Sequence, residues 1–219
     1  MHENVAVVIP ALESNQYYPD GDLISFGDNT LLEWKISQVM EVAENENIFI
    51  STPSDKIIQL AKELGLNFIK RNKVNDPSVW IPETVESIER EIIMWTHATS
   101  PFISPGDYRL MLEKFFSLSK GYDSLVTVYK EPEYFFFNGK TLNFDINNYK
   151  VRKEIDPVYR ITNGCYITPR ESYRQNRKYF GQSPFLYEVD KMAALEIKDI
   201  DHYEMVLNLL SLYFKVKES

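Results

Sequence analysis

The chain has 219 residues, with 24 Lys and Arg against 32 Asp and Glu, which gives a formal net charge of -8. The length suffices for one sizeable domain, and the acidic balance argues against nonspecific nucleic-acid binding, which depends on neutralising phosphates. The single cysteine, Cys165, excludes an intrachain disulfide and fits a reducing cytoplasm. Because no signal-peptide pattern and no apolar run of the ~20 residues needed for a membrane helix is found, we expect a cytoplasmic protein with no membrane partner.

The chain opens with a continuous apolar run over residues 5–9. Such a run predicts a strand buried on both faces, as in a parallel sheet covered by helices. Ligands of these folds bind beyond the carboxyl end of the first strand, which here is the loop of residues 12–22. This loop carries Glu13, Asp20 and Asp22 but no Lys or Arg. The architecture therefore suggests a nucleotide enzyme, whereas the loop lacks the cations that would bind phosphates.

Strands and helices then alternate along the chain. The patterns predict helices over residues 30–42, 55–64, 82–93 and 108–120, and strands over residues 48–52, 67–71 and 124–129. Gly65 closes the second of these helices, because glycine tolerates the left-handed conformation that ends helices. The alternation is typical of βαβ units and predicts an α/β fold with a mostly parallel sheet.

The pattern changes over residues 132–152, which are rich in aromatic side chains. Asn138-Gly139 is a hairpin signal, so we expect an antiparallel ribbon that projects from the sheet. Exposed aromatic side chains on such a ribbon require covering. Either a second subunit or the parent domain would cover them, and the sequence leaves both possibilities open.

Six segments of the chain are motifs that occur together in one enzyme family. They are Val-Ile-Pro-Ala at 8–11, Leu-Leu-Glu-Trp at 31–34, Ile-Ser-Thr with Asp-Lys-Ile at 50–57, Ala-Thr-Ser-Pro-Phe at 98–102, Tyr-Arg with Asn-Gly-Cys-Tyr-Ile at 159–167, and Asp-Ile-Asp at 199–201. In this order they span nearly the whole chain. The chain thereby resembles the acylneuraminate cytidylyltransferases, which join CTP to sialic acid or a related keto sugar acid to make a CMP-sugar.

The resemblance implies a fold, partners and an oligomeric state. The implied fold is a Rossmann-like three-layer sandwich with a mostly parallel central sheet and a small antiparallel extension. One nucleotidyltransferase domain would cover residues 1–219, with residues 130–160 as its dimerisation extension. CTP and a keto sugar acid would be the substrates, and the protein would be a homodimer.

Asp199 and Asp201 resemble the Asp-x-Asp motif that precedes the last helix of the family. In the family these carboxylates bind the Mg²⁺ that neutralises charge at the nucleotide phosphates, so the resemblance makes both residues catalytic metal ligands. On a strand, two side chains separated by one residue project from the same face. The alternative is structural: Asp199 caps the helix that begins near His202.

The remaining candidate residues divide between the two substrates. For the nucleotide, the resemblance implies Ala11, Leu12, Asp22, Arg71 and Ser100. For the sugar acid, it implies His97 (at a position where the family often has Gln), Thr99, Arg160, Asn163 and Gly164. Five of them have an ordinary alternative role: His97 is a structural histidine, Arg71 and Arg160 are surface charges, and Asn163-Gly164 is a tight turn. A bidentate contact from Arg160 would suit the substrate carboxylate.

The first loop departs from the family. Leu12 stands where the family has Arg, Gln16 and Gly21 stand where it has Lys, and Asp22 replaces an Asn. One donor that stabilises developing charge contributes about 2.7–4 kcal/mol to catalysis, so losing three cations weakens triphosphate binding and makes it depend on Mg²⁺. Two functions stay open: transfer of CMP from CTP to a keto sugar acid with release of pyrophosphate, or a catalytically impaired relative that binds or regulates.

Overall fold

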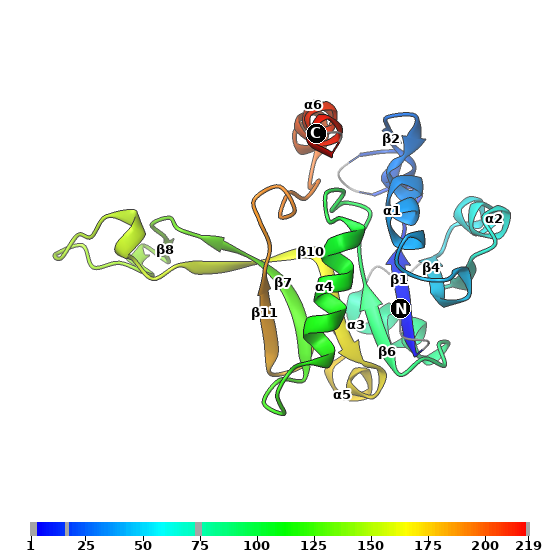
Figure 1. The fold of residues 1–219 in the computed structure, drawn as a ribbon, viewed down its shortest axis with the longest axis horizontal. Helices are drawn as coiled ribbons and strands as arrows, with labels where there is room; N and C mark the ends of the chain where they lie inside the picture. Colours follow the sequence, from blue (N-terminus) through cyan, green and yellow to red (C-terminus); the bar gives the residue numbers. More distant parts are fainter. Residues whose placement is uncertain (1–3, 16–17, 73–75, 218–219) are drawn as a thin grey trace.

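The computed structural model describes residues 4–15, 18–72 and 76–217, and its centre is a seven-stranded sheet (Figure 1). The strand order is β11-β7-β10-β6-β1-β4-β5. The strands are β1 (Val5–Pro10), β4 (Ile48–Thr52), β5 (Asn67–Lys70), β6 (Ile92–Trp95), β7 (Ser124–Glu131), β10 (Val158–Pro169) and β11 (Pro184–Glu188).

The first strand lies inside the sheet, as the apolar run predicts. All six residues of β1 are buried, and the strand pairs in parallel with β4 on one side and β6 on the other. Neighbouring positions of β1 face opposite layers: Val5, Val7 and Ile9 pack into one hydrophobic core, and Ala6 and Val8 into another. The strand is therefore covered on both faces.

Helices form the two outer layers. The helices are α1 (Leu31–Met40), α2 (Asp55–Glu63), α3 (Pro77–Glu86), α4 (Pro105–Phe116), α5 (Tyr173–Asn176) and α6 (Ile200–Lys217). Side chains of α1, α2 and α4 pack into the first core, and side chains of α3 and α5 into the second. The three-layer α/β sandwich with a mostly parallel sheet is confirmed.

The helix predicted over residues 82–93 is wrong. Instead α3 begins at Pro77, where the Asp76 carboxylate accepts from the Ser78 backbone N–H, and Pro82 lies inside the helix. Residues Ile92–Trp95 form strand β6 between β1 and β10. A run of four apolar residues buried in a sheet has no alternation, so its pattern alone does not separate it from a buried helix. Helix α4 also begins earlier than predicted, at Pro105 after its cap Ser104.

Strand β10 is the antiparallel member of the sheet. It pairs antiparallel with both β6 and β7, and its register to β7 shifts between Ile161 and Tyr166. Asn163-Gly164 lies in this bulge, so the alternative of an ordinary tight turn is wrong. Bulges redirect side chains and often lie beside binding sites.

Smaller elements complete the domain. A two-stranded hairpin of β2 (Ser25–Phe26) and β3 (Asn29–Thr30) packs through Phe26 into a third hydrophobic core with α6. The 3-10 helices are η1 (Gly21–Leu23), η2 (Asn45–Asn47), η3 (Arg152–Glu154) and η4 (Arg170–Ser172). In the part of the chain that is described, no helix combines the length and apolar character needed to cross a lipid bilayer.

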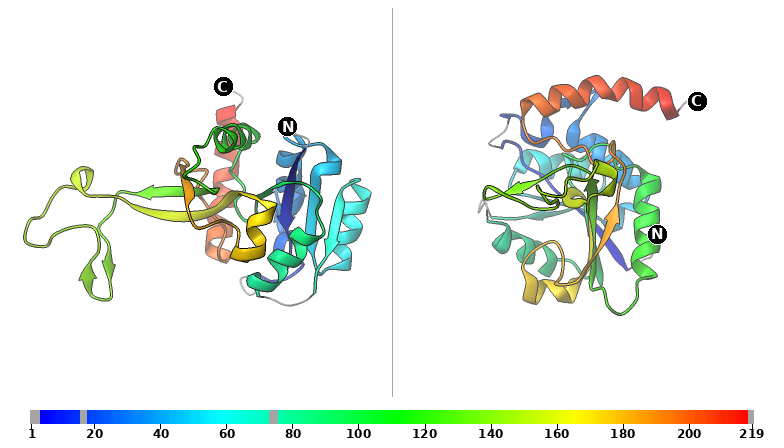
Figure 2. Two further views of the ribbon diagram at one scale, coloured as in Figure 1. Left: turned by 90° about the horizontal axis from the view of Figure 1, so that it is seen from below. Right: turned by 90° about the vertical axis from the view of Figure 1, so that its left-hand side faces the viewer.

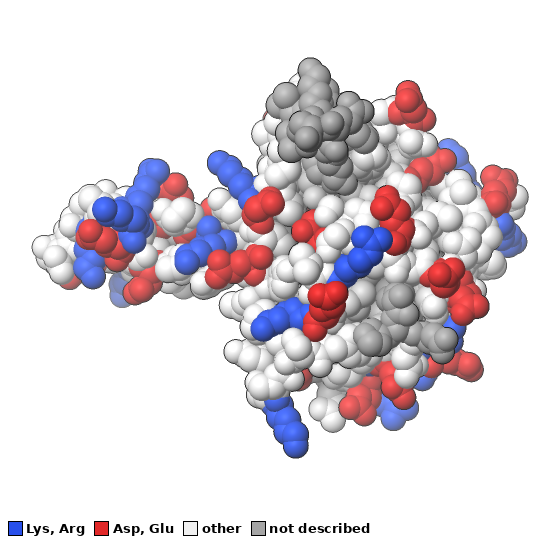
Figure 3. Space-filling view, in the orientation of Figure 1, with Lys and Arg blue, Asp and Glu red and all other residues white. Residues whose placement is uncertain are grey.

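Residues 132–157 form an arm that projects from the sheet between β7 and β10 (Figures 1 and 2). Its hairpin joins β8 (Phe136–Phe137) to β9 (Lys140–Thr141) through Asn138 and Gly139, whose φ angles of 50° and 75° suit the predicted Asn-Gly turn. Phe136 and Phe137 are 62% and 65% exposed, so the parent domain does not cover them. Charges of both signs are interspersed along the arm in Figure 3.

Candidate functional site

A cavity of about 560 Å³ opens at the carboxyl ends of β1, β5 and β6. Its lining residues are Pro10, Leu12, Asn15, Asp22, Arg71, Pro77, Trp80, His97, Ala98, Thr99, Ile161, Asn163, Tyr179, Glu196, Ile197 and Lys198. A larger cavity, about 790 Å³, lies at the opposite end of the sheet, where β6 begins and β10 ends. Since open α/β sheets bind ligands at the carboxyl ends of their parallel strands, the smaller cavity is the candidate site.

The first loop is closed at its neck by Leu12 and Asp22. The Leu12 N–H donates to the Asp22 carboxylate at 2.8 Å, and the Asp22 N–H donates to the Leu12 carbonyl at 2.8 Å. Burial raises the pKa of Asp22 to about 6, although the bond from Leu12 and the charge of Arg71 oppose the rise. Both residues line the cavity. The nucleotide side of the predicted site thus has a buried acidic group in its wall.

The first loop leaves no room for a side chain at Gly21, where the resemblance places a lysine. The φ of Gly21 is +50°, and a Cβ at this position would lie 2.3 Å from the Leu12 carbonyl oxygen. A lysine at residue 21 therefore does not fit this loop without moving its backbone. Gln16, the other position where the family has Lys, lies outside the described residues.

Arg71 is the buried cation of the cavity. Arg71 is 8% exposed, and its guanidinium lies 4.2 Å from the centre of the Trp80 ring. The Nε atom of Arg71 has no hydrogen-bond partner among the described residues. A buried donor without a partner is costly. The Arg71 side chain is therefore ready to bind a ligand that brings an acceptor into the cavity.

His97 is held by two neighbours and is not free to contact a ligand. Its Nδ1 lies 3.2 Å from the Asn163 carbonyl, so Nδ1 carries the proton and Nε2 accepts from the Tyr179 hydroxyl at 3.0 Å. Burial lowers the pKa of His97 to about 4, so the ring is neutral at pH 7. The predicted hydrogen bond from His97 to the sugar acid would require breaking one of these contacts.

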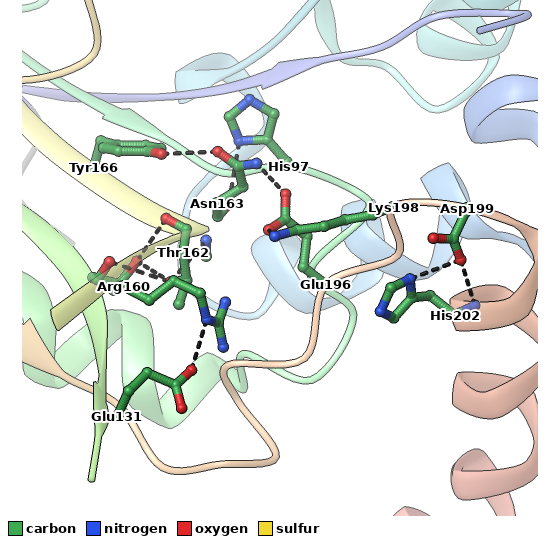
Figure 4. A network of polar contacts seen from close by, with 12 residues as sticks. His97, Glu131, Arg160, Thr162, Asn163, Tyr166, Glu196, Lys198, Asp199 and His202 are labelled. Atoms are coloured by element: carbon green, nitrogen blue, oxygen red, sulfur yellow. Dashed lines mark hydrogen bonds and ion pairs between the residues drawn. The ribbon is translucent and has the colours of Figure 1, made fainter. Parts of the chain in front are cut away.

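Asn163 connects three elements at the cavity wall (Figure 4). Its amide oxygen accepts from the Tyr166 hydroxyl at 2.8 Å, and its amide nitrogen donates to the Glu196 carboxylate. The Tyr166 ring in turn stacks on Tyr179 with ring centres 4.8 Å apart. This network fixes the side of the cavity that the resemblance assigns to the sugar acid.

Glu196, Ile197 and Lys198 border the cavity together, and Ile197 anchors the three residues. Ile197 is 2% exposed, and its N–H donates to the Thr99 carbonyl at 2.8 Å. This anchor leaves the two flanking side chains on the cavity, with Lys198 Nζ 3.3 Å from the Glu196 carboxylate. The sequence reasoning missed both residues.

Asp199 and Asp201 do not line the cavity. They lie at the start of α6 and not on a strand: the Asp199 carboxylate accepts from the His202 backbone N–H at 2.8 Å and from its ring at 2.7 Å. These bonds lower the pKa of Asp199. Figure 4 shows Asp199 directed toward His202, whereas Glu196 is directed toward Asn163. The helix cap that the sequence left as the alternative is the role that Asp199 has here.

The other candidate residues divide between the cavity wall and positions outside it. Thr99 lines the cavity. Arg160 does not, because its guanidinium pairs with Glu131 at 2.9 Å near the base of the arm. Ala11, Ser100 and Gly164 are buried and do not line the cavity.

A buried lysine that the sequence reasoning missed contacts one of these residues. Lys35 on α1 is fully buried and donates to the Ser100 carbonyl at 2.9 Å and to the Tyr108 hydroxyl at 2.8 Å. The Tyr108 hydroxyl bonds to Thr96, whose own hydroxyl donates to the Gly164 carbonyl at 2.8 Å. These hydrogen bonds join α1, α4 and β10 to Thr96, which follows the end of β6.

Comparisons with known proteins indicate one enzyme family and one fold. The profile of the cytidylyltransferase family matches residues 7–217. The N-acylneuraminate cytidylyltransferase of Escherichia coli O18:K1:H7 is 20% identical over 223 residues, which cover 95% of this chain and 52% of that protein. The chain spans about half the length of the curated relatives it matches.

Solved structures share the fold at low identity. CMP:2-keto-3-deoxy-manno-octonic acid synthetase, solved in complex with CTP, has a TM-score of 0.70 at 16% identity, with 96% of this chain and 99% of that chain covered. The 4-diphosphocytidyl-2C-methyl-D-erythritol synthase of Anaerococcus prevotii has a TM-score of 0.68 at 14% identity, with 94% and 96% covered.

Proposed function

Because the chain belongs to the cytidylyltransferase family, we propose that it transfers CMP from CTP to a keto sugar acid and releases pyrophosphate. The observation that carries the proposal is the convergence in one cavity of Leu12, Asp22 and Arg71 with Thr99 and Asn163. The first group is the one that the resemblance assigns to the nucleotide, and the second the one that it assigns to the sugar acid. The names of two similar proteins, an N-acylneuraminate cytidylyltransferase and a CMP:2-keto-3-deoxy-manno-octonic acid synthetase, support this substrate class.

The proposed reaction is a displacement at phosphorus. A hydroxyl oxygen of the sugar acid bonds to the α-phosphorus, the bond from that phosphorus to the bridging oxygen breaks, and pyrophosphate leaves with the electron pair. The hydroxyl proton passes to solvent. Arg71 holds the nucleotide with a guanidinium that Trp80 supports, and the Asn163 network positions the acceptor sugar, so that catalysis rests on proximity and orientation.

The predicted Mg²⁺ has a poor set of ligands in this chain. Asp199 is engaged by His202, neither Asp199 nor Asp201 lines the cavity, and no group of three or more His, Cys, Asp or Glu residues suited to a metal occurs in the described segments. Mg²⁺ favours carboxylate and phosphate oxygens in octahedral geometry. The donor set does not fit the ion, and no step of the proposed reaction is assigned to it.

A second candidate function is binding without turnover. It is favoured by the first loop, which has no Lys or Arg over residues 12–22 and whose Glu13 carboxylate is engaged by the Ser54 hydroxyl. In this case the chain would bind a cytidine nucleotide and act as a binding or regulatory protein.

Two measurements separate these functions. Titration calorimetry with CTP tests binding, and release of pyrophosphate with a set of keto sugar acids tests turnover. Arg71→Met should reduce CTP affinity about 10- to 100-fold, since it removes a charged donor, and Arg109→Met, on an exposed part of α4, should not. Binding with pyrophosphate release supports the transferase. Binding without release supports the second function, and absence of CTP binding refutes both.

We also propose that the arm pairs with a second copy of the chain. Support comes from the exposure of Phe136 and Phe137 at the tip of a hairpin that the domain does not cover. Light scattering at micromolar concentration should give the mass of a dimer, and Phe136→Ser with Phe137→Ser should reduce it. A monomer in the unchanged protein would contradict the assignment.

A further inference from the structure

The charges on the cavity wall are few and balanced. Its lining residues include two cations, Arg71 and Lys198, and two carboxylates, Asp22 and Glu196. Arg71 is buried against Trp80, whereas the Lys198 side chain is 48% exposed at the cavity edge. A ligand with several negative charges would therefore find one fixed cation and one cation on a flexible stem.

Both carboxylates of the cavity already have partners. One oxygen of Asp22 accepts the Leu12 N–H at the neck of the first loop. Glu196, whose side chain is only 9% exposed, accepts from the Asn163 amide through one oxygen and pairs with Lys198 through the other. A divalent ion that took Glu196 as a ligand would compete with the Asn163 amide and with the Lys198 ammonium, which it would also repel.

The position of Lys198 is set by the backbone. Ile197 is anchored to Thr99, and the residues on either side of it border the cavity. Glu196 is thereby locked into the wall by Asn163, and its second oxygen holds the ammonium 3.3 Å away at the mouth. An ammonium with three donors on a long stem is able to turn from a carboxylate to a phosphate oxygen without moving the backbone.

We propose that Lys198 supplies the positive charge at the nucleotide phosphates that a divalent cation would otherwise supply, so that this chain binds its nucleotide without a metal. The inference rests on the proposed function, because it takes the cavity to be the nucleotide site. Lys198, held by Glu196, would thus supply the charge that the resemblance assigns to a metal ion on Asp199 and Asp201.

The test is titration calorimetry with CTP, once in EDTA and once in excess Mg²⁺. The unchanged protein should bind CTP with affinities that differ less than about threefold between the two buffers. Lys198→Ala should lose about 10- to 100-fold in EDTA, the effect of removing one charged donor. Lys191→Ala is the matched control, because Lys191 is exposed in the same segment but does not line the cavity, and its affinity should not change.

A charge reversal gives a second readout. Lys198→Asp should bind CTP more weakly than Lys198→Ala in EDTA and should recover affinity when Mg²⁺ is added, because the new carboxylate and Glu196 would then both face the cavity. Binding of CTP by the unchanged protein only in Mg²⁺, or full affinity of Lys198→Ala in EDTA, would overturn the inference and leave the proposed function intact. Failure to bind CTP in either buffer would overturn both.

Discussion

Replacing Lys35 by Met should remove a rise of stability with pH. Burial lowers the pKa of Lys35 to about 7 from an ordinary value of 10.5. Between these two values the unfolded chain binds a proton that the folded chain does not, so the free energy of unfolding rises with pH. The contribution of Lys35 to the free energy of unfolding is fully present above about pH 10.5, and it is lost as the pH falls through the pKa of about 7 in the folded chain.

The size of the effect follows from the linkage relation. Each pH unit within the window changes the free energy of unfolding by up to about 1.4 kcal/mol. With half of Lys35 protonated at the start, the change between about pH 7.0 and pH 8.5 is roughly 1.5 kcal/mol. For a chain of this length, that difference corresponds to a shift of roughly 3–6 °C in Tm.

The assay is thermal unfolding followed by circular dichroism across this pH range. The unchanged protein minus Lys35→Met gives the contribution of Lys35, because the other titrating groups are common to both. Burial also raises the pKa of Cys165, which lowers stability at higher pH, so the range ends below about pH 9. Lys56→Met, on the exposed side of α2, should retain the full pH dependence. An equal slope in Lys35→Met and the unchanged protein would refute the reasoning.

Three further predictions concern the first loop and its neighbour. Asp22 and His97 have opposite pKa shifts, to about 6 and about 4, so their effects on stability oppose each other between these values. Asp22→Asn removes the loss of stability that Asp22 causes as the pH rises. Between about pH 4 and pH 6, its free energy of unfolding should therefore rise by about 2 kcal/mol relative to the unchanged protein. Urea unfolding at the two pH values measures this rise, and a constant difference between the two proteins would contradict it. Leu12→Arg should raise CTP affinity about tenfold, with Leu12→Met as the unaffected control in calorimetry. Gly21→Ala should cost about 1–3 kcal/mol in urea unfolding because its Cβ has no room, whereas Gly121→Ala, with nothing within 4 Å, should be neutral.

The layers of the fold were accessible from local pattern. The apolar run of β1 and the Asn138-Gly139 turn each depend on neighbours in sequence, so the sequence predicts them. The prediction for Ile92–Trp95 was wrong because the strands that pair with this segment, β1 and β10, are distant in sequence. The signal that was overlooked lies upstream, where Asp76 followed by Pro77 marks the start of a helix.

The site was harder to predict than the fold, because two adjacent pairs of charged residues have the same spacing. Glu196 and Lys198 have the same spacing as Asp199 and Asp201, and which pair borders the cavity depends on tertiary contacts: Ile197 is bonded to Thr99, whereas Asp199 caps α6. The burial of Lys35 does have a signal in the sequence. Lys35 lies four residues from both Leu31 and Val39, which places it on the apolar face of α1. Trp80 and Tyr179 meet the cavity only through tertiary folding, and nothing in their sequence surroundings marks them.

The arm is a part of the chain that could be removed without disturbing the sheet. Glu131 and Val158 are register partners on adjacent antiparallel strands, so the excursion leaves the sheet and returns to the place where it started. A short β-turn in place of residues 132–157 would join the same two strands without changing the register of any other pair. The length and composition of the arm are therefore free to change while the cavity stays as it is. If the arm forms the proposed contact with a second copy, that contact and the cavity would depend on different segments of the chain, and each could be changed by engineering without the other.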